Sequence, residues 1–177
     1  MALMAFGSSV CAPVITLRWF PVVFINLARR VGISAYSVGM SESKKNAADY
    51  TALVIDDEET SQELARMALE RLGLTSIWVA GDGALAIKAM DKMARPPDFV
   101  ISDIFMPQSD GIELVNDLAK RQYAGGLVLV SGGDTQFLVI AKRIARFHGL
   151  NLLGSLTKPL RTDALAQILF GSEQDMT

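Results

Sequence analysis

Acidic, hydroxyl and amine side chains follow the apolar runs of this sequence. Asp103 comes directly after the run 99–102 and precedes a loop that contains Pro107. The other groups of this kind are Asp56, Asp57, Ser131 and Lys158. A carboxylate at the carboxyl end of a parallel strand lies where open α/β sheets carry their chemistry. We therefore interpret Asp103 as a nucleophile that accepts a phosphoryl group, with a metal ion, a hydroxyl and an amine placed around it.

Three carboxylates at one edge of a sheet would repel one another strongly unless a cation lies among them. Oxygen ligands at an open site favour Mg²⁺, which would offset the charge of a phosphoryl group as it approaches Asp103. The Ser131 hydroxyl could donate a hydrogen bond to one phosphoryl oxygen, and the Lys158 ammonium could pair with another. Phosphoryl transfer needs little beyond such positioning and charge compensation.

Five apolar runs predict five strands, and a segment with helical spacing follows each of them. The predicted strands cover residues 51–55, 76–80, 99–102, 127–130 and 152–156. Continuous apolar runs are typical of parallel strands that are covered on both faces. The alternation predicts an α/β fold with a doubly wound, five-stranded parallel sheet of the (βα)5 type and right-handed crossovers. The parallel order brings the polar groups to one edge of the sheet.

Cap residues and helical spacing delimit the predicted helices. Thr60 and Glu63 fit a capping box at the first helix, which predicts an inward face with Leu64, Ala68 and Leu72. The caps predicted for the other helices are Asp82, Asp110, Asp134 and Thr162. The inward residues predicted for the second and third helices are Leu85, Ala86, Ala89, Met90 and Met93, then Leu114, Val115 and Leu118.

Taken in order, these motifs resemble the receiver domain of two-component response regulators. The resemblance covers about residues 50–170 and depends on Asp56-Asp57, Asp103, Met106-Pro107, Asp110-Gly111, Ser131 and Lys158-Pro159. It implies a flavodoxin-like fold and a cytoplasmic signalling switch, not a conventional enzyme. Asp103 would receive a phosphoryl group from a histidine kinase or phosphotransfer protein. The resemblance also implies roles for the site residues. Mg²⁺ would be bound directly by Asp57, Asp103 and the main-chain carbonyl of Phe105, and through water by Asp56. Ser131 and Lys158 would bind the phosphoryl group.

Two positions depart from the pattern of this family. Many receivers carry an aromatic switch residue three positions before the lysine, where this chain has Ser155. Phe105 places a bulky apolar group beside the acceptor, where it would affect the access of water to the phosphoryl group. A phosphorylation-independent protein-interaction module on the same fold is therefore the alternative function. A weaker likeness, over residues 131–160, is to receivers fused to EAL cyclic-di-GMP phosphodiesterases, which suggests an output protein linked to cyclic-di-GMP turnover.

Other kinds of site fit the sequence less well. Cys11 and His148 are the only residues of their types, which excludes a cysteine or multi-histidine metal site within one chain. Residues 81–86 match a dinucleotide-binding pattern, but Asp82 would place a negative charge where a pyrophosphate binds, so we interpret them as a turn and a helix cap. A phosphatase of the haloacid dehalogenase type would need a second aspartate two residues after Asp103, where Phe105 stands.

Charge divides the chain into two parts. Residues 1–48 carry five basic residues and one acidic residue, whereas the remainder carries 12 basic and 18 acidic residues. An acidic domain is a poor candidate for direct nucleic-acid binding. We expect a receiver domain over residues 50–171 and a tail over 172–177, and we leave a homodimer open. For residues 1–48 we favour an extension that precedes a true start near Met40; a weak membrane-associating segment over 12–28 and an ordered extension are the alternatives.

Overall fold

The structure is a computed structural model that describes residues 45–106, 109–133 and 135–171. The predicted tail, residues 1–44 of the predicted N-terminal extension, and the predicted cap Asp134 lie outside these residues, as does the side chain of Asp110. In the described part of the chain, no helix has the length and apolar character needed to cross a membrane.

A parallel sheet of five strands forms the centre of the fold, as the sequence predicts. Its strands are joined in the order β2-β1-β3-β6-β7, and all neighbours are parallel. Their bounds are β1 Thr51–Ile55, β2 Ser76–Ala80, β3 Phe99–Asp103, β6 Gly126–Ser131 and β7 Asn151–Thr157. The last three are longer than predicted by one or two residues. A two-residue antiparallel pair that the sequence analysis did not predict, β4 (Phe105–Met106) with β5 (Ser109–Asp110), follows β3.

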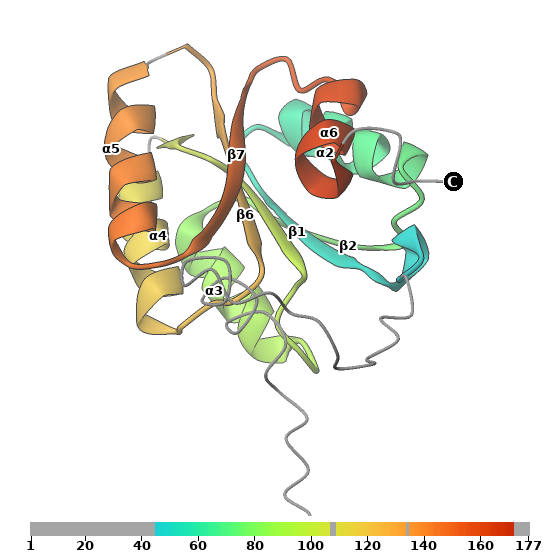
Figure 1. The fold of residues 1–177 in the computed structure, drawn as a ribbon, viewed down its shortest axis with the longest axis horizontal. Coiled ribbons are helices and arrows are strands. Elements are labelled where there is room, and N and C mark those ends of the chain that lie inside the picture. The colour runs from blue at the N-terminus through green and yellow to red at the C-terminus, as the bar shows by residue number, and fades with distance from the viewer. Residues whose placement is uncertain (1–44, 107–108, 134, 172–177) are drawn as a thin grey trace, which may run out of the picture. The chain divides into compact units, whose positions relative to one another are not determined.

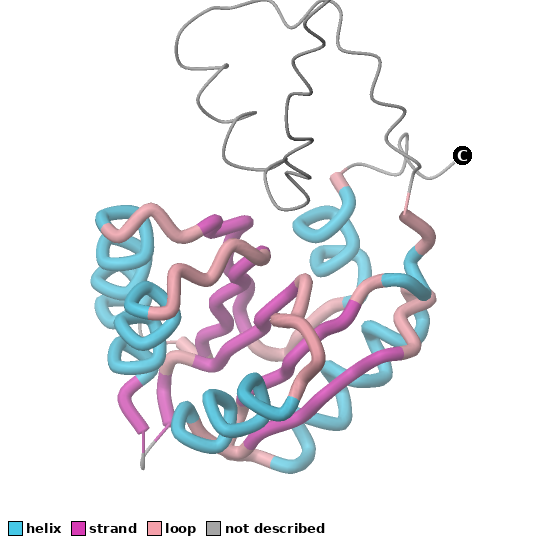
Figure 2. The backbone as a smooth tube through the Cα atoms, turned by 90° about the horizontal axis from the view of Figure 1, so that it is seen from below, coloured by secondary structure: helices cyan, strands magenta, loops and turns pink. Residues whose placement is uncertain are grey.

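Helices cover both faces of this sheet (Figure 1). Their bounds are α2 Glu59–Arg71, α3 Gly83–Lys92, α4 Gly111–Lys120, α5 Thr135–Phe147 and α6 Thr162–Phe170. Figure 2 shows the same arrangement in a view from below. Alternate residues of β1 enter two separate cores: Leu53 and Ile55 pack with α3, α4 and α5, while Ala52 and Val54 pack with α2 and α6. Because both faces are covered, the strands read as continuous apolar runs.

The predicted inward faces of two helices need correction. On α2 the buried residues are Ala65, Ala68 and Leu69, whereas Leu64 is 47% exposed. The predicted capping box is also wrong, because α2 begins at Glu59 and its N-cap residue Glu58 makes no side-chain cap hydrogen bond.

On α3, Ala86 is fully buried, but Leu85 is 49% exposed. The cap itself is confirmed, since the Leu85 N–H donates to Asp82 Oδ1 at 2.6 Å. On α4, Leu114, Val115 and Leu118 are buried as predicted.

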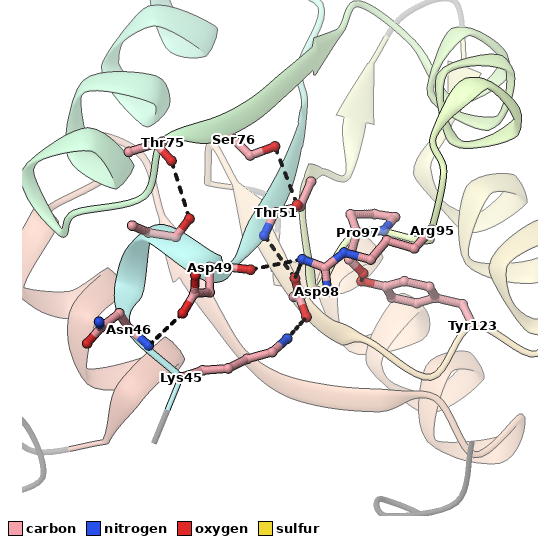
Figure 3. A network of polar contacts seen from close by, with 11 residues as sticks. Lys45, Asn46, Asp49, Thr51, Thr75, Ser76, Arg95, Pro97, Asp98 and Tyr123 are labelled. Atoms are coloured by element: carbon pink, nitrogen blue, oxygen red, sulfur yellow. Dashed lines mark hydrogen bonds and ion pairs between the residues drawn. The ribbon is translucent and has the colours of Figure 1, made fainter. Parts of the chain in front are cut away.

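A polar network joins the strands at their amino ends (Figure 3). The Asp98 carboxylate accepts a hydrogen bond from the Thr51 N–H at 2.9 Å and one from Lys45 Nζ at 2.8 Å. The Asp98 main chain donates to the Thr51 carbonyl and accepts from the Gly126 N–H, each at 2.8 Å. Asp98 therefore links the starts of β1, β3 and β6 with Lys45, which precedes the 3₁₀ turn Ala47–Asp49. These contacts align three strands whose other ends carry the candidate site.

Candidate functional site

The carboxyl edge of the sheet brings the predicted acids together. Asp103 ends β3, a strand whose five residues are all buried, and Asp56 directly follows β1. The strands are neighbours, and Ile55 is in register with Ser102. Asp56, Asp57 and Asp103 offer carboxylate oxygens within 4.8 Å of one another. Asp56 and Asp103 are 5% and 4% exposed, whereas Asp57 is exposed.

The Lys158 ammonium bridges the two buried carboxylates. Its Nζ lies 2.6 Å from Asp103 Oδ2 and 2.7 Å from Asp56 Oδ2. Lys158 follows the end of β7, and its main-chain N–H donates to the Ser131 carbonyl at 2.9 Å. The peptide bond from Lys158 to Pro159 is cis. The last strand and the turn after it thus deliver an ammonium to acids on β1 and β3.

Main-chain groups satisfy the other oxygen of each buried acid. Asp103 Oδ1 accepts a hydrogen bond from the Phe105 N–H at 2.9 Å, and Asp56 Oδ1 accepts one from the Glu58 N–H at 3.0 Å. The Gln62 side-chain amide also donates to the Asp56 carbonyl at 2.6 Å. Both buried carboxylates are therefore held in fixed orientations, which suits a preorganised polar site.

Burial and the ion pair with Lys158 shift the pKa values of the site residues in opposite directions. Burial raises the pKa of Asp56 above its usual value, although the hydrogen bonds from Lys158 and Glu58 oppose this rise. Burial disfavours the charged form of Lys158, but hydrogen bonds to Asp103 and Asp56 outweigh it and raise the pKa of Lys158. Lys158 therefore stays charged at neutral pH. Burial disfavours the ionised form of Asp56.

The donor set fits a hard divalent cation. All three acids offer oxygen, and a single ammonium does not balance three carboxylates. Asp57 is exposed, as a ligand at an open site should be, whereas Asp56 is already bonded to Lys158 and Glu58. Mg²⁺ uses one or two carboxylates and keeps several waters, which matches such a cluster.

Ser131 ends β6 and is 4% exposed. Its hydroxyl accepts a hydrogen bond from the Gly133 N–H at 3.4 Å. A Cβ atom placed on Gly132 or Gly133 would meet no described residue within 4 Å, so these two positions after Ser131 are not crowded by the described part of the chain. Ser155 lies in β7, partly buried and in register with Leu129. Of the two predicted switch positions, Ser131 is the one at the edge that carries the acids.

A hollow of about 350 Å³ lies beside the acids and was not predicted from the sequence. Its lining includes Asp56 and Lys158, the α2 residue Leu64, and Pro159 and Leu160 in the turn after β7. Leu64 was predicted to lie in the core, so no feature of the predicted pattern indicated this hollow. The apolar residues of its lining therefore lie directly beside the polar site.

The comparisons with known proteins agree with this arrangement. A model of the response regulator receiver domain matches residues 52–170. The probable chemotaxis protein CheY of Rhizobium etli is 32% identical over 123 residues, which are 68% of this chain and 92% of that protein. The alkaline phosphatase synthesis transcriptional regulatory protein PhoP of Bacillus subtilis is 33% identical over 85 residues, which are 48% of this chain and 34% of PhoP.

The solved structures show the same fold. A response regulator from Colwellia psychrerythraea aligns with a TM-score of 0.58 and 25% identity, over 72% of this chain and 97% of that one. The receiver domain of NtrX from Brucella abortus aligns with a TM-score of 0.56 and 28% identity, over 66% of this chain and 92% of that one. Matched over most of its described residues, and with the acids and lysine in place, the chain belongs to the response regulator receiver domain family.

Proposed function

We propose that this chain is the phosphoacceptor receiver of a two-component phosphorelay, with Asp103 as the acceptor. The observation that carries the proposal is the Lys158 ammonium, bonded to both Asp56 and Asp103 within a cluster of three acids. The donor is a histidine kinase or a phosphotransfer protein. Bound Mg²⁺ would offset negative charge at the site, and the proposed ligands are Asp57, Asp103 and the Phe105 carbonyl, with Asp56 acting through water.

The proposed step is attack by an Asp103 carboxylate oxygen on the phosphorus of a phosphohistidine. The new O–P bond forms as the N–P bond breaks, and its electron pair stays on the donor's nitrogen. The Phe105 N–H would keep the carboxylate oriented. Lys158 would exchange its bond with Asp103 for one with a phosphoryl oxygen, since a phosphoryl group adds about 1.5 to 2 negative charges.

Ser131 is the proposed link between the phosphoryl group and the surface. Its hydroxyl, which accepts a hydrogen bond from the Gly133 N–H, would move to donate its own hydrogen to a phosphoryl oxygen. No described residue crowds Gly132 or Gly133, which would give Ser131 room to move, and α5 begins at Thr135. A shift of Ser131 would therefore alter the start of α5, and an altered surface is the proposed signal.

The donor protein would cover the hollow beside the acids. Leu64 and Leu160 line this hollow together with Lys158, and Leu64 is 47% exposed. An apolar side chain that is exposed beside a polar site is suited to contact a partner protein while the acids take part in phosphoryl transfer.

Incubation with acetyl phosphate and Mg²⁺, followed by intact-mass spectrometry, tests the proposal. We expect a mass gain of one phosphoryl group that Asp103→Asn or EDTA abolishes. Asp91→Asn is the matched control, because Asp91 is an exposed acid paired with Arg121 away from the site. A gain that survives Asp103→Asn, or that does not need a divalent cation, contradicts the proposal.

A phosphorylation-independent interaction module is the second candidate, and Ser155 favours it because many receivers carry an aromatic residue there. Backbone amide spectra with Mg²⁺ and beryllofluoride separate the two functions. Shifts that spread from Asp103 to α5 support the phosphorylation switch. Unchanged spectra favour the module.

From the sequence and the family we also propose a receiver domain over residues 50–171 and a tail over 172–177. The domain would act in signalling without conventional enzyme activity. It would be cytoplasmic and would not bind nucleic acid. A homodimer and an output protein linked to cyclic-di-GMP turnover are further proposals.

A further inference from the structure

Strand β2 forms one end of the parallel sheet, beyond β1 (Figure 1). In the described part of the chain, no strand pairs with its other edge. Two large apolar side chains of this strand, Trp78 and Val79, are 40% and 39% exposed. An exposed strand edge with apolar side chains is a template for pairing with another chain. We call Ile77, Trp78 and Val79 the β2 edge.

The β2 edge lacks the features that usually prevent such pairing. The strand Ser76–Ala80 contains no charged residue and no proline. Its residues pair with β1 in one unbroken register, so no bulge turns the strand away. The strand at the other end of the sheet, β7, has a register shift against β6 between Leu127 and Val128. Because charges, proline and bulges are what commonly protect edge strands, β2 is the edge that is open to pairing.

The bonds between β1 and β2 fix which main-chain groups of β2 face outward. The Asp56 N–H donates to the Ala80 carbonyl at 3.1 Å, so the main-chain groups of Ala80 face β1. In a strand, these groups alternate between the two sides from one residue to the next. Those of Trp78 therefore also face β1. The N–H and C=O groups of Ile77 and Val79 point away from β1, toward the open edge.

We propose that the β2 edge binds the β2 edge of a second copy of this chain, antiparallel to it and about a two-fold axis beside Trp78. In this register, Ile77 of one copy lies opposite Val79 of the other, and these residues exchange both main-chain hydrogen bonds. The same exchange occurs at the symmetric position. The two Trp78 side chains lie opposite each other between the hydrogen-bonded pairs, where side chains approach most closely.

The β2 edge is complementary to itself, which identifies a second copy as its occupant. A two-fold contact requires such a surface. The outward groups of Ile77 and Val79 lie symmetrically about Trp78, and antiparallel pairing joins a donor to an acceptor at both positions. The side chains also match, because a β-branched residue meets a β-branched residue and an aromatic ring meets its equal. No charged residue of β2 opposes its own copy.

Apolar surface beside the β2 edge would be covered in the same contact. Trp78 is in register with Leu53, so its side chain lies on the face of the sheet that α3, α4 and α5 cover. On α3, Asp91 pairs with Arg121, which follows α4. Leu85 precedes Asp91 by six residues, which places it about 240° away around the helix, off the side that faces α4. Leu85 is 49% exposed and adds apolar surface on the face that carries Trp78.

Analytical ultracentrifugation of the full chain tests the contact. We expect a monomer of 19.2 kDa in dilute solution and a dimer that becomes prominent at roughly 100 µM, because one strand pair makes a small interface. Trp78→Lys should raise the dissociation constant at least about tenfold, since it places like charges directly opposite each other. Trp78→Glu should do the same. A mixture of the two variants should form a mixed dimer, because opposite charges then face each other.

Cysteine cross-linking tests the register and keeps Trp78 in place. Cys11→Ser removes the one native thiol, and diamide serves as the oxidant. A mixture of Ile77→Cys and Val79→Cys should give at least about fivefold more disulfide-linked dimer than either variant alone, because the proposed pairing sets these positions opposite each other. Phe147→Lys is the matched control for Trp78→Lys, since Phe147 is 87% exposed on α5, and it should leave the dissociation constant unchanged. Circular dichroism checks that all variants are folded.

Several outcomes overturn the proposal. They are a native chain that stays monomeric at about 500 µM, a dimer that survives Trp78→Lys, and a mixture of the Trp78 variants that stays monomeric. Equal cross-linking of the mixture and of the separate cysteine variants overturns the antiparallel register. If a monomeric native chain binds a labelled extended peptide, and Trp78→Lys abolishes that binding, the edge belongs to a strand of another protein.

The contact does not depend on the proposed phosphoacceptor role, because no residue of the β2 edge belongs to the acid cluster. A chain that dimerises through this edge but gains no phosphoryl mass contradicts the proposed function and leaves the contact standing. A chain that is phosphorylated but stays monomeric overturns the contact alone.

Discussion

Loss of the Lys158 ammonium should leave two buried carboxylates without their shared partner. Lys158 Nζ contacts Asp103 and Asp56 at 2.6 and 2.7 Å, and its side chain is 23% exposed. Removing one partner of a buried ion pair costs about 3–5 kcal/mol. Because Lys158 is partly exposed and Asp57 is exposed, water reaches the cluster, and we expect Lys158→Met to cost about 3 kcal/mol. For a domain of roughly 120 residues, this lowers Tm by about 10 °C.

Thermal and urea unfolding in EDTA measure this cost without interference from divalent cations. Lys120→Met is the matched control, because Lys120 pairs with Asp117 at 2.8 Å but its side chain is 76% exposed. Exposed pairs contribute little, so the control should barely change Tm. Addition of Mg²⁺ should restore more stability to Lys158→Met than to the native chain, since three carboxylates without an ammonium attract a cation more strongly. If Lys158→Met unfolds at the same temperature as Lys120→Met in EDTA, the inferred role of this ion pair is wrong.

Three further perturbations test the site and its supporting loop. The raised pKa of Asp56 means that its contribution to stability is fully present below its unfolded pKa and is lost as pH rises through the folded value. Asp56→Asn should therefore be more stable than the native chain at neutral pH, with a smaller difference near pH 4, in urea unfolding at both pH values. Phe105→Ala should shorten the lifetime of the aspartyl phosphate roughly fivefold, about 1 kcal/mol in the barrier, by exposing it to water; an unchanged decay of the mass gain would contradict this role. Gly111→Ala should cost about 2 kcal/mol in urea unfolding, because its Cβ would lie 2.7 Å from Ile104 Cα, whereas Gly132→Ala, with no described residue within 4 Å of its Cβ, should cost little.

The strands were predictable because their environment is uniform. β1, β3 and β6 are central and are covered by helices on both faces, so every position favours an apolar residue. The groups at their carboxyl ends, Asp56, Asp103 and Ser131, stand out against such runs. The local signals thus sufficed for the strands and for most of the polar residues of the site.

Helix faces were less predictable, because several registers of one helix satisfy the same spacing. Leu64, Ala68 and Leu72 have the spacing of a buried face, as do Ala65, Ala68 and Leu69. The second set is the buried one, because α2 packs with that side against the strands and α6. Leu64 lies at the hollow beside the acids instead. The spacing of apolar residues alone does not predict which side of a helix packs against another element.

The sequence by itself determined the five strands, the alternation with helices, and the presence of three acids, a hydroxyl and a lysine at strand ends. These features follow from the composition of short segments. Only the tertiary structure decided that β1 lies between β2 and β3, and hence that one Lys158 ammonium bonds both Asp56 and Asp103. It also decided that Phe105 contacts Phe137 and that Phe137, Ile140 and Phe147 of α5 are exposed. Such contacts join residues far apart in the chain, and their distances depend on how strands and helices pack, which no local pattern of residues specifies.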